Sequence, residues 1–189
     1  MGLESFIMSG GKKSATIDYA TSGLTIQQAM VDMAKRYPSK KDRPKFIHWG
    51  KLCVQTADAI PVPAKGMIRL EFISARRGLE QGCDLAVDGW FTLANGFRVD
   101  HLRTWNEARF EPVVSYPYES NDGIIWFWNV YKRQAPNGQM IEEKWTENAG
   151  FWIQEAGPHV RIYHCSPGTL DDADFERLVV KLSFERRDS

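Results

Sequence analysis

From residue 46 onward, hydrophobic and polar residues alternate with a period of two, which is typical of β-strands that bury one face. In the segment 176–185 the hydrophobic positions are Leu178, Val180, Leu182 and Phe184. Shorter runs alternate in the same way at 68–72, 84–88 and 160–162. In the second of these runs Leu85 points to one face of the strand and Asp84 to the other. The pattern predicts a mostly β protein whose strands have one solvent-facing side.

Dipeptides that favour tight turns separate these runs. They are Asn95-Gly96, Asp122-Gly123 and Asn137-Gly138, and each supplies the positive φ that a two-residue hairpin requires. Hairpins in series build a sandwich or a barrel, and a chain of 189 residues fits one such domain. We therefore expect a single β-sandwich over residues 24–189. Residues 1–23, rich in Gly, Ser, Thr and Lys, are expected to form a loose arm before it.

One amphipathic helix is predicted ahead of the strands, over residues 25–37. Its apolar residues recur at helical spacing and are Ile26, Ala29, Met30, Met33, Ala34 and Tyr37. Thr25 and Gln28 have the spacing of a capping box at its start, and Pro38 ends it. At ~1.5 Å per residue this helix is shorter than the ~30 Å hydrocarbon core of a bilayer.

Two charged segments have local explanations. The segment 35–45 is strongly basic, which fits either a solvated connector or a patch for anionic lipid or phosphate. Near the C-terminus, Thr169 followed by Asp172 predicts a second short helix capped by its own acidic residues. The acids of this segment lack the glycine and the downstream glutamate of a calcium loop, so helix capping is the better interpretation.

Composition narrows the class of partner. The 24 basic and 24 acidic residues cancel, so the strong positive field that attracts nucleic acid is absent. Apolar residues make up 43% of the chain, but no apolar run approaches the ~20 residues of a membrane helix. Three widely spaced cysteines argue against a disulfide framework, and the first residues do not form a signal peptide. We expect a soluble protein that is cytoplasmic or released by an unconventional route.

The candidate reactive residues do not combine into an active site in the sequence. His159 and His164 lie five apart on a predicted strand and face opposite sides, so they cannot share a metal ion. Glu142 and Glu143 are adjacent, which is poor geometry for a pair of catalytic carboxylates. Cys165 has no evident partner base apart from its sequence neighbour His164. We expect a non-enzymatic protein with no cofactor and no metal.

The segment 124–131 is apolar on both faces, which predicts a central strand with Trp126 and Trp128 in the core. A second interpretation is that aromatic residues near strand ends line a binding site; these residues are Tyr116, Tyr118, Trp145 and Trp152. Tyrosine and tryptophan combine an apolar ring with a polar atom. They therefore suit a sugar face, a choline headgroup or a membrane interface.

Three successive segments carry a family pattern: 115–121 reads Ser-Tyr-Pro-Tyr-Glu-Ser-Asn, 126–132 reads Trp-Phe-Trp-Asn-Val-Tyr-Lys, and 139–143 reads Gln-Met-Ile-Glu-Glu. In order and approximate spacing they resemble the central motifs of the actinoporins, the pore-forming cytolysins of sea anemones. Gly150-Phe151 and the final alternating strand also fall where that family has them. The resemblance covers residues 110–185 at the level of motifs and implies an actinoporin-like β-sandwich.

The resemblance implies a pocket for a phosphocholine headgroup of the sphingomyelin type. Carried across position by position, it assigns Ser115 and Pro117 to this pocket and places Trp145 where the family has a pocket tyrosine; we add Tyr118 and Trp152 as further candidates. Ile141 and Thr146 replace two other pocket residues of the family. Asp122 and Gly123 stand where the family has a Trp-Tyr pair, which weakens membrane anchoring by several kcal/mol at ~1.5–3 kcal/mol for each apolar side chain.

Three functions follow as hypotheses. The first is binding of a membrane headgroup, with pore formation and oligomers on membranes as its extension. The second is a non-lytic lectin, because fungal fruit-body lectins share the fold, lack signal peptides and bind glycans. The third is a non-catalytic interaction or immunity protein in which the aromatic residues are all core.

Overall fold

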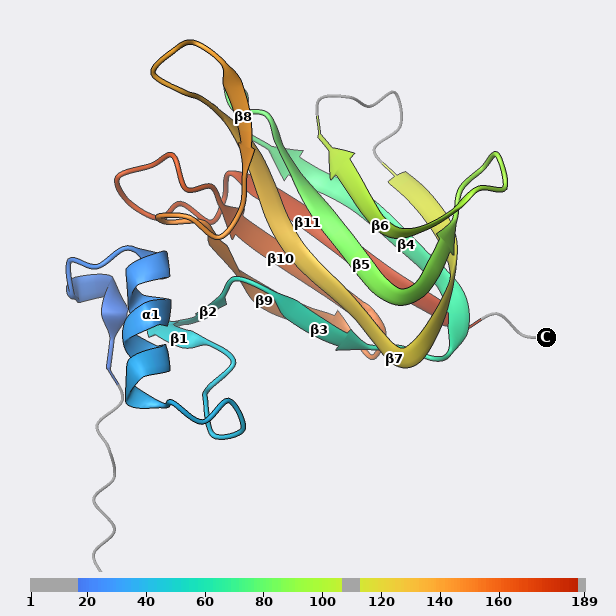
Figure 1. Ribbon diagram of the computed structural model, residues 1–189, viewed down its shortest axis with the longest axis horizontal. Coiled ribbons are helices and arrows are strands. Elements are labelled where there is room, and N and C mark those ends of the chain that lie inside the picture. Colours follow the sequence, from blue (N-terminus) through green and yellow to red (C-terminus); the bar gives the residue numbers. More distant parts are fainter. Residues whose placement is uncertain (1–16, 107–112, 187–189) are drawn as a thin grey trace, which may run out of the picture.

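The computed structural model describes residues 17–106 and 113–186, which form one antiparallel sheet with a helix beside it (Figure 1). The helices are the 3₁₀-helix η1 (Tyr19–Thr21) and the α-helix α1 (Ile26–Arg36). The strands are β1 (Ile47–Trp49), β2 (Leu52–Gln55), β3 (Asp58–Pro61), β4 (Lys65–Ala75), β5 (Gln81–Thr92), β6 (Arg98–Trp105), β7 (Val113–Gln134), β8 (Met140–Glu143), β9 (Gly150–Gly157), β10 (Val160–Ser166) and β11 (Leu178–Arg186). The predicted mostly β fold is confirmed. Most of the predicted arm, residues 1–16, lies outside the described residues.

The sheet folds over into two facing layers. Its strand order is β1-β2-β9-β10-β11-β4-β7-β5-β6, and β3 and β8 pair with β7 in addition. One layer contains β5, β6 and the second half of β7, and the other contains β9, β10 and β11 (Figure 1). Because β2 pairs with β9 and leads directly into β3, which pairs with β7, the two layers are joined along both sides. The fold is therefore sandwich-like.

Strand β7 belongs to both sides of this arrangement because it bends in the middle. Its first half pairs with β4 and its second half with β3, while β5 runs along both halves. The bend falls where the pairing with β5 is interrupted between Val87 and Gly89. At the bend Gly123 has a φ of 70°, and the hydroxyl of Ser120 accepts the N–H of Ile124 at 3.1 Å.

The turn predictions are confirmed at two positions and wrong at the third. Gly96 donates to the carbonyl of Leu93 in the β5–β6 hairpin, and Gly138 donates to that of Ala135 in the β7–β8 hairpin. Asp122-Gly123 was predicted as a third hairpin, but it lies inside β7. The positive φ is used there for a bend, because both halves of the strand find pairing partners on each side.

The main core lies between the layers. Phe127 of β7 stacks on Tyr163 of β10 with ring centroids 3.8 Å apart, and both rings contact Phe151 of β9. The alternating residues of β4 and β11 fill the same core and are Ile68, Leu70, Phe72, Leu178, Val180, Leu182 and Phe184. The predicted alternation of these strands is confirmed.

Helix α1 covers a second, smaller core. The predicted capping box is present, since Thr25 Oγ1 accepts the N–H of Gln28 and the Gln28 side chain accepts that of Thr25. The apolar face packs through Ile26, Ala29 and Met33 against β1, β2 and Phe175. The helix start is also held from outside, because Asn148 Oδ1 accepts the N–H of Ile26 at 3.2 Å.

The second predicted helix, beginning at Thr169, is wrong, because the segment consists of turns and bends. The side-chain amide of Asn148 donates to the carbonyls of Leu170 and Asp171, at 3.1 and 2.9 Å. The N–H of Asp174 donates to the hydroxyl of Ser166 at 3.1 Å instead of to Leu170. The carbonyls and N–H that a helix would pair internally therefore bond to groups on other segments.

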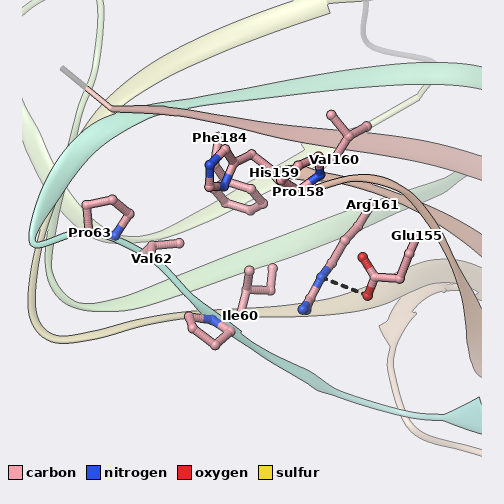
Figure 2. Close-up of a pocket in the computed structure, with 10 residues that line it drawn as sticks. Ile60, Val62, Pro63, Glu155, Pro158, His159, Val160, Arg161 and Phe184 are labelled. Atoms are coloured by element: carbon pink, nitrogen blue, oxygen red, sulfur yellow. Dashed lines mark ion pairs between the residues drawn. The ribbon is translucent and has the colours of Figure 1, made fainter. Parts of the chain in front are cut away.

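A pocket opens at one end of the two layers, beside the β9–β10 turn (Figure 2). Its walls come from the end of β3, from that turn and from β11, and it holds about 260 Å³. Within residues 17–106 and 113–186, no helix has both the length and the apolar character to cross a membrane.

Candidate functional site: the tryptophan face

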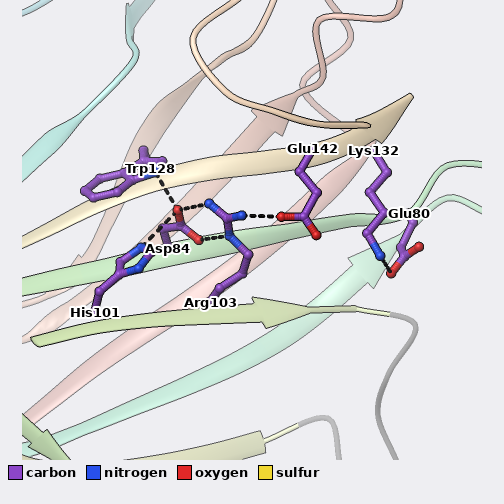
Figure 3. Close-up of polar contacts among 7 residues, drawn as sticks. All are labelled: Glu80, Asp84, His101, Arg103, Trp128, Lys132 and Glu142. Atoms are coloured by element: carbon purple, nitrogen blue, oxygen red, sulfur yellow. Dashed lines mark hydrogen bonds and ion pairs between the residues drawn. The ribbon is translucent and has the colours of Figure 1, made fainter. Parts of the chain in front are cut away.

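The outer face of the layer formed by β5, β6 and β7 carries a concentration of tryptophans and charges, continued by β8 and the residues after it. We call it the tryptophan face; it consists of Glu80, Asp84, His101, Arg103, Trp105, Trp126, Trp128, Lys132, Glu142, Lys144 and Trp145. Figure 3 shows its polar contacts, among Glu80, Asp84, His101, Arg103, Trp128, Lys132 and Glu142. The strand register sets its order, because residues paired across neighbouring strands point to the same side of a sheet. One row contains Arg103, Asp84 and Trp128.

Asp84 is the centre of this face, and its side chain is fully buried. Arg103 donates to it twice, from Nε to Oδ1 and from Nη2 to Oδ2, each at 2.7 Å. Trp128 Nε1 donates to Oδ2 at 2.8 Å, and Nε2 of His101 lies 3.1 Å from the same oxygen. Alternation predicted Asp84 on a solvent-facing side. That side is covered here because neighbouring strands bring two long side chains over the carboxylate.

Arg103 links the buried carboxylate to the surface. Its Nη1 bonds to Glu142 on β8, so one guanidinium holds two carboxylates (Figure 3). The hydrogen bonds that Arg103 donates to Asp84 raise the pKa of Arg103 above its ordinary value, so the guanidinium stays charged. Glu142 is more exposed than Arg103 or Asp84. Among the contacts of the described residues, its second oxygen is available on the surface. The network fixes the orientation of a solvent-accessible carboxylate.

Cations and indole rings alternate on this face. Lys144 Nζ lies 4.7 Å from the ring centroid of Trp128 and 4.5 Å from that of Trp145, whose rings are 5.5 Å apart. Lys132 Nζ lies 4.7 Å from the Trp105 ring and forms a 2.7 Å ion pair with Glu80. Such contacts stabilise both partners by cation–π attraction. The side chains are therefore held in place before any ligand arrives.

Trp126 and Trp145 expose their rings most. They are 42% and 41% exposed, whereas Trp128 is buried. Trp128 is thus buried as predicted, although it lies on the outer face and not in the core between the layers, and the core prediction is wrong for Trp126. Trp126 lies on the outer face because it alternates with the core residue Phe127, and its ring is exposed because its partners on the two neighbouring strands, Ala59 and Ala86, are too small to cover it.

Trp145 is held in a strained backbone conformation with a φ of 60°. Such a non-glycine residue costs of order 1–3 kcal/mol and persists only where neighbouring contacts enforce it. Those contacts surround Glu143, which bonds to Arg133 at 2.7 Å and to the hydroxyl of Tyr131 at 3.2 Å. The Arg133 bond is the main cause that lowers the pKa of Glu143. The short segment that presents Trp145 is therefore rigid.

The structure separates the predicted site residues along β7. Ser115 and Pro117 lie in its first half, paired with Arg69 and Met67 of β4. Tyr118 is buried, and its hydroxyl has no partner among the described residues. Burial raises the pKa of this hydroxyl. A ligand cannot contact Tyr118 without a rearrangement of the core.

The two predicted tryptophans belong to different clusters. Trp145 packs against Trp128 on the tryptophan face. Trp152 lies on β9, where its ring stacks on His164 of β10 with centroids 4.0 Å apart, and it borders the core under α1. Of the five predicted residues, the tryptophan face contains Trp145 alone.

Sequence reasoning missed Asp84, Arg103 and Glu142. One signal was present, because His101, Arg103 and Trp105 occupy alternate positions of a single strand and must share one face. Their meeting with Asp84 depends on the register between β5 and β6, which periodicity does not determine.

Other reactive groups do not assemble in the described part of the chain. Residues 17–106 and 113–186 contain no group of three or more His, Cys, Asp or Glu side chains able to hold a metal ion. Cys83 and Cys165 are buried, and burial raises the pKa of the Cys165 thiol well above its ordinary value. Cys53 is exposed. Comparison with known proteins finds no family model, no curated protein and no solved structure that matches the chain.

Proposed function

We propose that this is a non-catalytic binding protein with a sandwich-like fold that holds a carbohydrate on the tryptophan face. The observation that carries the proposal is the exposed indole of Trp126, which shares a cross-strand row with His101, whose imidazole contacts Asp84 and Trp128. A sugar ring has apolar C–H faces and hydroxyl edges. An exposed indole can pack against the first, and oriented charged or polar side chains can bond to the second.

The polar side chains of the tryptophan face can form hydrogen bonds with sugar hydroxyls. The free oxygen of Glu142 accepts hydrogen bonds, and the partly exposed imidazole of His101 lies next to Trp128, with ring centroids 5.8 Å apart. Because Asp84 and Arg103 hold these groups from below, few side-chain rotamers need to be ordered on binding. Preorganisation of this kind favours a weakly interacting ligand such as a glycan.

Charge balance supports an uncharged ligand. The face as defined contains three cations, Arg103, Lys132 and Lys144, and three carboxylates, Glu80, Asp84 and Glu142. Opposite charges are in contact in every case except Lys144, which lies over rings. The field over the face is thus close to neutral, which favours neither a polyanion nor a polycation.

Lys144 favours the headgroup hypothesis as a second candidate. Among the contacts of the described residues, its ammonium meets two indole rings and no carboxylate, so it is available to a phosphate. An exposed indole beside it could hold a choline. Pore formation has weaker support, because α1 is bonded to Asn148 and packs against its own core.

A glycan array probed with the labelled full chain tests the proposal, together with Trp126→Ala and a matched control, Phe97→Ala. Phe97 is also an exposed aromatic, 69% accessible, but it lies in the β5–β6 hairpin turn away from the face. We expect the wild type and Phe97→Ala to bind the same glycans and Trp126→Ala to lose them.

Vesicle sedimentation separates the second candidate. Binding to sphingomyelin vesicles that is lost in Lys144→Ala, without any glycan signal, would replace the carbohydrate by a headgroup. Equal binding of both aromatic variants to glycans would place the site elsewhere. Silence in both assays, with all variants folded, would leave a protein-interaction role.

A further inference from the structure

We propose that the pocket beside the β9–β10 turn binds a small apolar carboxylic acid, with Arg161 as the group that receives the carboxylate. The pocket is separate from the tryptophan face, because it is lined by the end of β3, the β9–β10 turn and β11. Figure 2 shows Arg161 and Glu155 on one side of it, with Val62, Pro63 and Phe184 around the rest.

Arg161 is anchored from the core. Its Nη1 donates to Asp58 Oδ2 at 2.6 Å, and the same oxygen accepts the hydroxyl of Tyr163 at 2.8 Å. Asp58 is buried between the layers, so this ion pair does not exchange readily with solvent. The guanidinium therefore has a fixed position, with one of its edges committed to Asp58.

The opposite edge of the guanidinium faces Glu155. Nε of Arg161 lies 3.3 Å from Glu155 Oε1, and the described contacts show no partner for Nη2. Glu155 is 64% exposed, and an exposed ion pair of this length contributes little. A ligand carboxylate can instead take Nε and Nη2 together, in the two-bond geometry that arginine favours. The Glu155 carboxylate thus binds weakly at the position on Arg161 that a ligand carboxylate would take.

The remaining walls select for an apolar body. Besides Arg161, Glu155 and His159, the residues that line the pocket are apolar: Ile60, Pro61, Val62, Pro63, Pro158, Val160 and Phe184. A volume of about 260 Å³ lies below the range typical of drug-sized ligands, so it fits a single small ring or a short branched chain. A ligand with a carboxylate at one end and such a group at the other matches both halves of the pocket.

Removal of the Glu155 side chain should raise the affinity of the pocket for an acid. This removal eliminates the competitor while leaving the anchor on Asp58 intact. Binding of an acid is then expected to strengthen by up to about fivefold, the factor that corresponds to an exposed ion pair. A residue with only a structural role in the pocket would not strengthen binding when it is removed.

Titration of the full chain with phenylacetate, followed by calorimetry and by the NMR signals of Val62 and of Arg161 Nε–H, tests the proposal. We expect saturable binding of phenylacetate and no binding of phenylacetamide, which has the same shape without the charge. Glu155→Ala should bind phenylacetate more tightly, and Arg161→Lys should bind it more weakly.

The acid–amide comparison needs no variant, so it remains decisive even if Arg161→Lys fails to fold. Equal binding of acid and amide would overturn the assignment of Arg161. Absence of saturable phenylacetate binding in both the wild type and Glu155→Ala would overturn the site itself. Neither result bears on the tryptophan face.

Discussion

Replacement of Asp84 by asparagine perturbs the centre of the tryptophan face while preserving its shape. The buried carboxylate accepts two bonds from Arg103 and one from Trp128, with His101 also in contact. An asparagine amide has one accepting oxygen, and its NH₂ must face a donor in either orientation. The less costly orientation places the NH₂ against Arg103 Nε, because two donors, Arg103 Nη2 and Trp128 Nε1, converge on the other oxygen.

The expected loss in the free energy of unfolding follows from these contacts. A hydrogen bond to a charged group contributes about 1.5–3 kcal/mol, and one such bond is replaced by a repulsive contact. The paired charge is lost as well, but Arg103 is partly exposed, so its unpaired charge is solvated and the cost stays below that of a fully buried pair. We expect Asp84→Asn to lower the free energy of unfolding by roughly 2–4 kcal/mol, which is roughly 4–16 °C in Tm.

Urea unfolding followed by tryptophan fluorescence measures this loss directly, and near-ultraviolet circular dichroism reports on the Trp128 environment. Asp88→Asn is the matched control, because Asp88 is an exposed aspartate on the same strand. Its stability should stay within about 0.5 kcal/mol of the wild type. If Asp84→Asn were as stable as this control, the buried network would not organise the face.

Three further predictions concern other parts of the fold. Thr25→Ala removes the capping side chain of α1 and should lower the free energy of unfolding by about 1 kcal/mol in a thermal melt, whereas Thr25→Ser should be nearly neutral. Gly82→Ala places a Cβ against the backbone carbonyl of Thr104, so it should destabilise the β5–β6 pair and raise hydrogen exchange of its amides; unchanged exchange would refute the close approach. Alkali should unfold the protein, because burial raises the pKa of Tyr131 to about 12 and that of Tyr163 well above 10.0. The unfolded chain loses these protons first, so stability must fall as pH rises above about 10; ionisation of Tyr131 or Tyr163 well before unfolding, followed by the NMR signals of their rings, would contradict this.

The sequence determined much of the fold through local signals. The capping box at Thr25 and the alternation of 178–184 each depend on neighbours within a few residues, and both are confirmed. The turn at Asn95-Gly96 is confirmed for the same reason. Local sequence patterns gave a wrong prediction where a residue distant in the sequence determines the conformation. The segment after Thr169 is not helical because Asn148, more than twenty residues away, binds its carbonyls.

The candidate site could be predicted only in part. Trp145 was a predicted site residue, and it lies on the tryptophan face. Asp84 looked like an ordinary solvent-facing position, because periodicity says which side of a strand a residue faces and not what covers that side. The covering depends on the register that sets Arg103 and Trp128 beside it. The apolar residues on both faces of segment 124–131 predicted a core position for Trp126. Its exposure depends on the small size of Ala59 and Ala86, which become its neighbours only in the folded sheet.

Contact between a sugar and the tryptophan face can be observed directly in the NMR signals of the indole N–H groups. The labelled protein would be titrated with the glycan that gives the strongest array signal, and each tryptophan signal assigned by substitution. We expect saturable shifts for Trp126 and Trp145, with no change for Trp152, which stacks on His164 on another part of the molecule. Shifts confined to Trp152, or saturation that leaves Trp126 unchanged, would contradict the proposed contact.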